Sequence, residues 1–203
     1  VTIVGSLASV LGEPGRLALT YAQIGASASA YLLGAIVGAV FFGKMADRFG
    51  RKRLFLVTLG IYLAATIATA FSWGFVSFAI FRALTGAGIG GEAGAMNSAI
   101  DELIPARVRG RVDLAINGTY WLGTAVGAAA SLVLLDERIV PRNVGWRLAF
   151  GLGASLGLAI LLVRRHLPES PRWLLLHGRV DEAERVVDRI ELDVARGGAL
   201  SPV

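Results

Sequence analysis

Residues 24–43 read IGASASAYLLGAIVGAVFFG, a stretch of 20 residues without a charged side chain. A helix of about 20 apolar residues is long enough to cross the ~30 Å hydrocarbon core of a lipid bilayer. The same stretch, taken alone, also fits the core helix of a water-soluble protein. The sequence on either side of it decides between these two interpretations.

Four similar stretches follow, and they are almost free of charge. A soluble core explains one such stretch but not five in a chain of 203 residues. The pattern therefore predicts an all-α, polytopic membrane helix bundle. We expect five transmembrane helices within residues 24–163, at residues 24–43, 54–72, 75–100, 114–135 and 146–163.

The composition excludes several other classes of protein. Hydrophobic residues make up 55% of the chain and charged residues 17%, against about 25% charge in ordinary soluble domains. The chain has no cysteine, which excludes disulfide frameworks, thiol chemistry and Cys-ligated zinc. His166 and His177 lie in separate segments without a cluster of other ligands, so we expect no metal site and no cofactor.

The basic residues are divided unevenly between the links. Fifteen of the 20 Lys and Arg residues lie in residues 44–53, 107–111 and 164–203, on one side of the predicted bundle, and four lie on the other. The positive-inside rule places the first side in the cytoplasm, as in a multi-pass protein of the plasma or inner membrane. Because the charge is divided among short turns, we expect lipid and not nucleic acid as a partner.

Both ends of the chain are interpreted from the same pattern. We expect residues 1–11 to be the end of a truncated first transmembrane helix, so that the chain is a fragment. Residues 164–203 are expected to form a cytoplasmic linker. In it, Ser170 caps a short helix that stops at Gly178, and Asp181 caps an amphipathic helix that runs to residue 195.

The link after the first stretch reads GKMADRFGRKR over residues 43–53. It resembles the G-x-x-x-D-R-x-G-R-[KR] loop between the second and third helices of the major facilitator superfamily. Glycine permits a tight turn, and aspartate and arginine can bind helix ends and carboxylates. A basic turn that only fixes the topology is the alternative interpretation.

Three further resemblances to this superfamily come in the expected order. Residues 82–92 (RALTGAGIGGE) resemble its fourth-helix segment, and residues 102–110 (ELIPARVRG) resemble the loop that follows. Residues 168–174 (PESPRWL) are similar to the element after the sixth helix of sugar-porter-like members. The resemblance covers nearly the whole chain and implies the N-terminal six-helix half of a twelve-helix transporter, whose C-terminal half is then its partner.

The resemblance also implies a network of charges and glycines on the cytoplasmic side. In the family, the first of these loops holds one half of the transporter against the other and controls the conformational switch. The alternative is a solvated surface, where exposed ion pairs contribute only ~0–1 kcal/mol. The implied gating residues are Gly43, Asp47, Arg48, Gly50, Arg51, Glu102, Arg109, Gly110, Glu169 and Arg172.

Arg82 and Glu92 are charges inside a predicted span, where an unpaired charge costs at least ~2.5–3.5 kcal/mol. They lie about 15 Å apart along one straight helix, so they need different partners. The resemblance implies proton coupling or gating for Arg82, whereas bracing of a neighbouring helix through its carbonyl groups is the alternative. Glu92 is interpreted either as a proton site or as part of the cytoplasmic network with Arg109 or Arg51.

One polar and aromatic stripe is a candidate for the substrate cavity. Asn117, Tyr120, Trp121 and Thr124 share one helical face, and contact between helices or anchoring at the interface is the alternative role. Tyr31, with Ser27 and Ser29, is a weaker candidate. Residues 113–121 lack the glutamine pattern of hexose carriers, which argues against a sugar, and residues 90–92 look more like carriers of organic acids and other metabolites.

We therefore expect a secondary active transporter of a small polar metabolite, a sugar or an organic acid, working by alternating access with proton symport. A transporter-like nutrient sensor that binds its ligand without moving it is the alternative. We do not expect an enzyme, because the sequence shows none of the common hydrolytic or metal-binding motifs.

Overall fold

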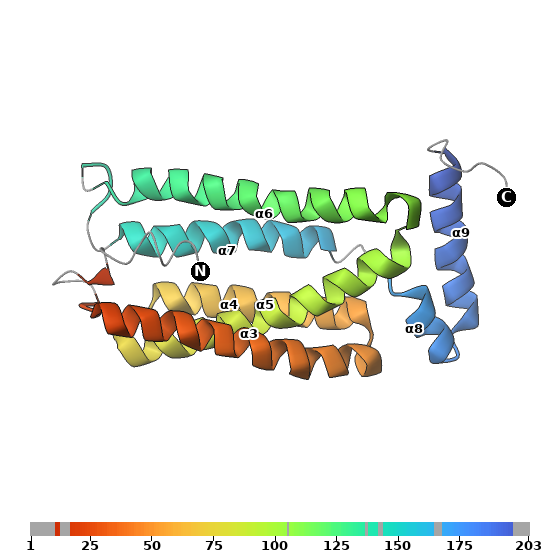
Figure 1. Cartoon of the computed structure of the whole chain (residues 1–203), viewed down its shortest axis with the longest axis horizontal. Coiled ribbons are helices and arrows are strands. Elements are labelled where there is room, and N and C mark those ends of the chain that lie inside the picture. Colours follow the sequence, from red (N-terminus) through yellow and green to blue (C-terminus); the bar gives the residue numbers. More distant parts are fainter. Residues whose placement is uncertain are drawn as a thin grey trace.

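The computed structural model describes residues 11–12, 17–104, 106–136, 138–141, 144–164 and 168–196. These residues form helices joined by short links, with no strand among them (Figure 1). Apart from Leu11, the expected end of a first helix at residues 1–11 lies outside the described residues. The helices are α3 (Tyr21–Phe49), α4 (Arg51–Ala70), α5 (Phe75–Leu103), α6 (Ala106–Leu134), α7 (Gly145–Arg164), α8 (Pro171–Leu176) and α9 (Val180–Arg196).

Most of the motif at residues 43–53 is helical, although the sequence suggests a link there. Residues 43–49 form the last turns of α3, and α4 begins at Arg51. Gly50 alone separates the two helices, with φ of 92°. The change in chain direction is therefore concentrated in one residue whose backbone conformation favours glycine.

Two of the described helices, α3 and α4, are long and apolar enough to cross a membrane by length and composition alone. A shorter apolar segment runs over Gly145–Ile160 in α7. The sequence predicts five membrane spans, whereas length and mean hydropathy select fewer helices. The difference has a physical reason. Arg82 and Glu92 lower the hydropathy of α5, and a polar and aromatic stripe lowers that of α6.

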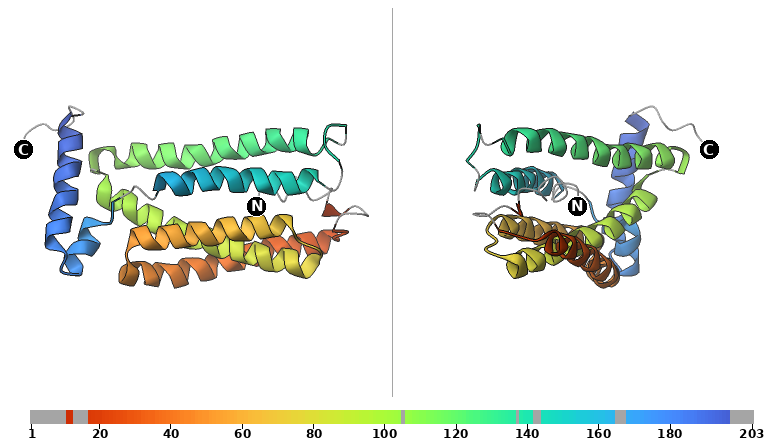
Figure 2. Two further views of the ribbon diagram at one scale, coloured as in Figure 1. Left: turned by 180° about the vertical axis from the view of Figure 1, so that it is seen from behind. Right: turned by 60° about the vertical axis from the view of Figure 1, so that its left-hand side comes forward.

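The long helices run side by side, with α5 crossing the others obliquely (Figures 1 and 2). The most extensive contacts join α3 to α5, α4 to α5 and α4 to α7. In contrast, α6 touches α5 and α7 only sparsely. The structure therefore has a tight group, α3–α4–α5–α7, with α6 as a loosely packed wall.

Glycines on both helices allow α3 and α5 to approach backbone to backbone. A Cβ atom at Gly34 or Gly38 of α3 would overlap the carbonyl of an alanine on α5. A Cβ atom at Gly86 or Gly90 of α5 would equally overlap a carbonyl of α3. Small residues at such spacing are typical of helices that associate in lipid. This packing sets Tyr31 of α3 beside the first turns of α5.

One end of the bundle is closed by an apolar cluster that includes Phe78, Trp146 and Phe150. Beside it, a guanidinium nitrogen of Arg147 donates to the carbonyl of Ala70, and the guanidinium lies over the Trp146 ring, 4.5 Å from its centroid. These contacts tie the first turn of α7 to the last turn of α4. They hold the walls of the bundle together at this end.

The tail packs at the opposite end, where α9 lies across the direction of the bundle (Figure 1). Ser170 caps α8 by accepting from the amide of Trp173 at 3.2 Å, which confirms the expected cap. Gly178 follows α8 with φ of 72°. The expected cap at Asp181 is wrong, because α9 already begins at Val180 and places Asp181 in its first turn.

Candidate functional site

Two sites contain most of the residues that the sequence singles out. The first is the α8 junction, which we define as residues 47–52 together with residues 169–173. The second is the interhelical cavity, a hollow between α3, α4, α5, α6 and α7. They are described in turn.

At the α8 junction, the carboxylate of Glu169 binds the start of α4. It accepts from the backbone amides of Arg51 at 2.9 Å and Lys52 at 3.1 Å, and from the amide of Ser170 at 3.0 Å. The N-cap of α4, Gly50, has no side chain that could do this. The first amides of a helix lack partners within it and carry a partial positive charge. A carboxylate from a distant segment therefore caps α4.

Trp173 fastens α8 to the end of α3. Its indole Nε1 donates to the backbone carbonyl of Asp47 at 3.1 Å. Its ring stacks on that of His177 with centroids 4.1 Å apart, and Arg179 lies 5.9 Å from its centroid. The end of α3 and the start of α4 are thus both bound by one short segment.

Gly50 is required at the α8 junction for two independent reasons. Its φ of 92° is unfavourable for a residue with a side chain. A Cβ atom there would also lie 2.5 Å from Oε2 of Glu169 and 3.4 Å from the Trp173 ring. Any other residue would strain the turn and displace the capping carboxylate.

The implied gating residues are only partly brought together. Asp47, Gly50, Arg51 and Glu169 lie together at the α8 junction, where Glu169 accepts from the backbone amide of Arg51 and Trp173 donates to the backbone carbonyl of Asp47. Of the other members, Arg48 and Arg172 are exposed, with Arg48 over the Phe49 ring, and Gly43 and Gly110 face open space. Arg109 donates to the carbonyl of Ile104. Glu102 lies in α5, and its side chain is outside the described part.

The sequence does not single out Trp173 and Lys52, which also contribute to this site. The capping motif around Ser170 signals where α8 begins, but nothing local signals that Glu169 reaches α4. The contact joins residues 118 positions apart in the chain. Only the fold brings the two motifs together.

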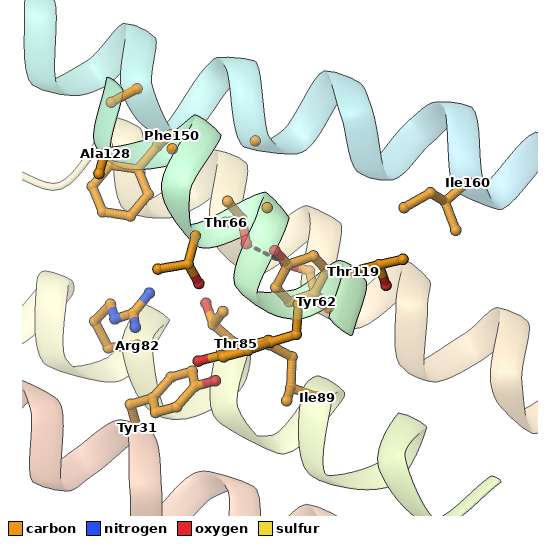
Figure 3. A pocket seen from close by; sticks show the side chains of 16 residues that line it. Tyr31, Tyr62, Thr66, Arg82, Thr85, Ile89, Thr119, Ala128, Phe150 and Ile160 are labelled. Atoms are coloured by element: carbon orange, nitrogen blue, oxygen red, sulfur yellow. Dashed lines mark hydrogen bonds between the residues drawn. The ribbon is translucent and has the colours of Figure 1, made fainter. Parts of the chain in front are cut away.

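The interhelical cavity has a volume of about 500 Å³. Figure 3 shows Tyr31, Tyr62, Arg82 and Thr85 on the α3–α4–α5 side, facing Phe150 and Ile160 across it. Its described lining is rich in hydroxyl groups and glycine. The lining residues are Tyr31, Tyr62, Thr66, Arg82, Thr85, Ile89, Thr119, Tyr120, Gly123, Thr124, Gly127, Ala128, Ala149, Phe150, Gly153 and Ile160.

Arg82 is buried in the wall of this cavity, with 5% of its surface exposed. Its guanidinium lies over the Tyr31 ring, 4.6 Å from the centroid, which is a cation–π contact. Among the described residues, Nε of Arg82 has no hydrogen-bond partner. One interpretation from the sequence is that Arg82 braces a neighbouring helix through its carbonyl groups. The part of the chain that the structure describes contains no hydrogen bond of this kind.

The candidate stripe on α6 divides into two parts. Tyr120 and Thr124 line the cavity. Asn117 instead donates to the backbone and side chain of Asp113, and Trp121 is 70% exposed. At about 100° per residue, the face of α6 that lines the cavity is rotated by roughly 60° from the predicted stripe. The rotation brings Gly123 and Gly127 into the wall, and neither was predicted there.

Several other lining residues were also missed, among them Tyr62, Thr66 and Thr85. The available signal was the i, i+4 spacing of Tyr62 and Thr66 within an otherwise apolar stretch. Tyr31, the weaker candidate, does line the cavity. Glu92 is half-buried and interacts electrostatically with Tyr62, but it is not among the lining residues.

Comparison with known proteins places this geometry in a family. The model of the family described as "Sugar (and other) transporter" matches residues 8–197. The chain belongs to this family of the major facilitator superfamily. Its members are integral membrane transporters and not enzymes, which confirms the expected class.

Two relatives and one solved structure illustrate the similarity. The chain is 38% identical over 174 residues to the niacin transporter of Acinetobacter baylyi, covering 86% of this chain and 38% of the relative. It is 35% identical to myo-inositol transporter 2 of Cryptococcus neoformans, covering 78% and 28%. The proton:xylose symporter XylE superposes with a TM-score of 0.80 at 22% identity, covering 93% of this chain and 44% of XylE.

The coverage of these proteins locates the chain within the family fold. The chain spans less than half the length of each relative and corresponds to the N-terminal half of the XylE fold. This confirms the predicted all-α, N-terminal bundle of a major facilitator fold. The interhelical cavity therefore lies in a chain that corresponds to the N-terminal half of this fold.

Proposed function

We propose that this family member forms one half of a secondary active transporter in the cell membrane. It moves a small polar metabolite by alternating access, with symport of a proton. The observation that carries the proposal is the interhelical cavity, because a buried arginine and several hydroxyl groups inside a membrane bundle mark a substrate or ion pathway. Relatives named for niacin, myo-inositol and xylose support a small metabolite as the cargo.

Alternating access requires each half to move as a rigid body against the other. The α8 junction suits this role, because Glu169 and Trp173 bind α3 and α4 into one unit at their connected ends. The side chains of Asp47, Arg48 and Arg172 are exposed there. They are available to bind the second half in one of the two conformations and to release it in the other.

Proton coupling is assigned to the charged groups of α5. Arg82 lies in the cavity wall beside Tyr31, and Glu92, ten residues further along α5, interacts electrostatically with the lining residue Tyr62. A proton that binds at Glu92 changes the field around Tyr62. Substrate and proton then occupy one connected region, which is the requirement for coupling the two.

The experiment is uptake by the full-length transporter reconstituted in proteoliposomes, with an imposed proton gradient. We expect saturable uptake of a small metabolite that collapses with a protonophore and is lost in Asp47→Ala. Uptake that is unchanged by the protonophore contradicts symport, and full uptake by Asp47→Ala contradicts the gating role. Ligand binding without uptake would favour the sensor.

A further inference from the structure

Helix α4 keeps one face exposed along its whole length. Val57, Ala64, Ile67 and Phe71 are all exposed, and their spacings of three, four and seven residues place them on one side of the helix. The opposite side packs against α5 and α7, and α4 faces the viewer in the left part of Figure 2. We call this exposed side the α4 outer face. It consists of residues 53, 57, 60, 64, 67 and 71.

Arg53 lies at the end of the α4 outer face that is nearest the α8 junction. Its side chain is exposed, and its guanidinium has no hydrogen bond or ion pair among the described residues. It belongs to the first turn of α4, where the backbone amides carry a partial positive charge. A cation at this place is repelled by the helix dipole. Its charge therefore suits an anionic partner outside the described part of the chain.

The other end of the α4 outer face is aromatic. Phe71 and Trp73 are 69% and 80% exposed. The amides of Trp73 and Gly74 donate to the hydroxyl of Ser77 at 3.2 and 3.3 Å, which fixes the turn between α4 and α5. The Trp73 ring meets the Phe81 ring edge to face, and its indole N–H has no partner among the described residues. An apolar ring with a free donor is typical of the membrane–water interface.

The distance between these two ends matches the thickness of a bilayer. Phe71 lies 18 residues after Arg53, which is about 27 Å along a helix, and the hydrocarbon core is about 30 Å thick. Helix α3 gives a compatible value. Its exposed Tyr21 and Lys44 are 23 residues apart, or about 35 Å, which places both in the headgroup layers.

We propose that the α4 outer face binds phospholipid across the full bilayer. Arg53 binds a headgroup phosphate of one leaflet, and the indole N–H of Trp73 donates to an ester carbonyl or phosphate oxygen of the other. Acyl chains cover the apolar residues between them. The face continues the lipid-exposed surface that an integral membrane transporter has, and Arg53 adds charge complementarity to anionic headgroups.

The second half of the transporter is the competing occupant of this face. It could cover Val57, Ala64 and Ile67 with apolar side chains of its own. A protein partner, however, has no fixed thickness, whereas the separation of Arg53 from the aromatic end equals that of two headgroup layers. The two occupants differ in whether small apolar molecules dissolved in the membrane reach the face.

The first test attaches a nitroxide to single cysteines of the full-length transporter, in a background without other cysteines, reconstituted in phosphatidylcholine and phosphatidylglycerol. Labels at Val57→Cys, Ala64→Cys and Ile67→Cys should collide more with oxygen than with a water-soluble nickel chelate, and most so at residue 64. At Arg53→Cys the chelate should dominate. Leu63→Cys is the matched control, because Leu63 is 6% exposed and its label should be shielded from both.

The second test examines the aromatic anchor. Trp73→Phe should remove part of the fluorescence quenching caused by brominated phospholipids, and more of it when the bromine is near the glycerol than near the chain end. Trp146→Phe is the control, since Trp146 lies at the same end of the bundle but is 1% exposed. Its loss should leave the quenched intensity unchanged.

The third test examines the charged anchor. Phosphatidylglycerol should raise the unfolding temperature of the full-length transporter above its value in phosphatidylcholine, and Arg53→Gln should reduce this difference. Arg179→Gln is the control, because Arg179 is paired with Glu182 at 2.6 Å in the tail and should not change the difference.

Three outcomes overturn the inference. If labels on the α4 outer face are shielded from oxygen and chelate alike, the second half covers it. If the chelate dominates at residue 64, the face is in water. If neither Trp73→Phe nor Arg53→Gln changes its lipid readout, the two ends do not bind lipid. None of these measurements uses a cargo or a proton gradient, so each outcome leaves the proposed transport function to its own test.

Discussion

Glu169 caps the helix that begins at Arg51, although 118 positions separate the two residues in the chain. The carboxylate meets two backbone amides at the positive end of α4, and a neighbouring indole binds the last turn of α3. The tail is therefore a structural part of the bundle and not a free extension. Its attachment leads to the first two predictions.

Glu169→Ala should lower the free energy of unfolding by about 1–2 kcal/mol, because the first amides of α4 lose their acceptor and the helix dipole its counter-charge. Glu169→Gln should cost less, since an amide oxygen can still accept. Thermal unfolding of the full-length protein in detergent measures both. Glu184→Ala on the exposed face of α9 is the control, and an equal loss there would contradict the capping role.

Gly50→Ala should be more damaging than a glycine substitution elsewhere in the same motif. The left-handed backbone at Gly50 and the overlap with Glu169 together should cost on the order of 1–3 kcal/mol and detach α8. Gly43→Ala, whose Cβ meets nothing within 4 Å, should be neutral or slightly stabilising. Trp173 fluorescence and thermal unfolding report the two effects, and similar behaviour of the two variants would refute the argument.

Gly90→Ala should separate α3 from α5, because its Cβ would overlap the backbone carbonyl of Ala35, which cannot move aside like a side chain. We expect a loss of about 1–3 kcal/mol in stability and weaker ligand binding, since Tyr31 and Arg82 lie across the same helix pair. Gly118→Ala on α6 is the control, as its Cβ would face open space. Unfolding and binding curves compare them.

Lys44→Cys tests the orientation. The described chain contains no cysteine, and Lys44 is exposed in the last turns of α3. Since most basic residues lie on this side, a thiol at residue 44 should resist an impermeant maleimide added to intact cells and react after permeabilisation. The full-length protein needs a background without other cysteines. Labelling from outside would reverse the proposed topology.

Sequence alone predicts the elements of this fold better than their contacts. Apolar stretches mark each long helix, and capping chemistry marks the start of α8 at Ser170. Both signals are local. The face that α6 turns to the cavity is not a local property, because it depends on how α6 packs against α5 and α7. That face is offset by roughly 60° from the predicted polar stripe.

The charge network shows the same limit. Asp47, Arg51 and Glu169 belong to the predicted charge network, and all three lie at the α8 junction. Glu169 and Trp173 bind backbone amides and a carbonyl there, and such groups are present in every residue and leave no trace in the sequence. Arg82 was recognised as exceptional from its place in an apolar stretch, whereas its contact with Tyr31 required the register of α3 against α5.

The glycines between α3 and α5 also show which wall of the cavity tolerates larger side chains and which does not. Adding even a single carbon at Gly34, Gly38, Gly86 or Gly90 forces two backbones apart, so a library for altered cargo should leave these positions untouched. Gly123 on α6 lines the same hollow yet has open space around it. Bulk introduced there would narrow the chamber without dismantling its frame, which makes α6 the natural starting point for retuning selectivity.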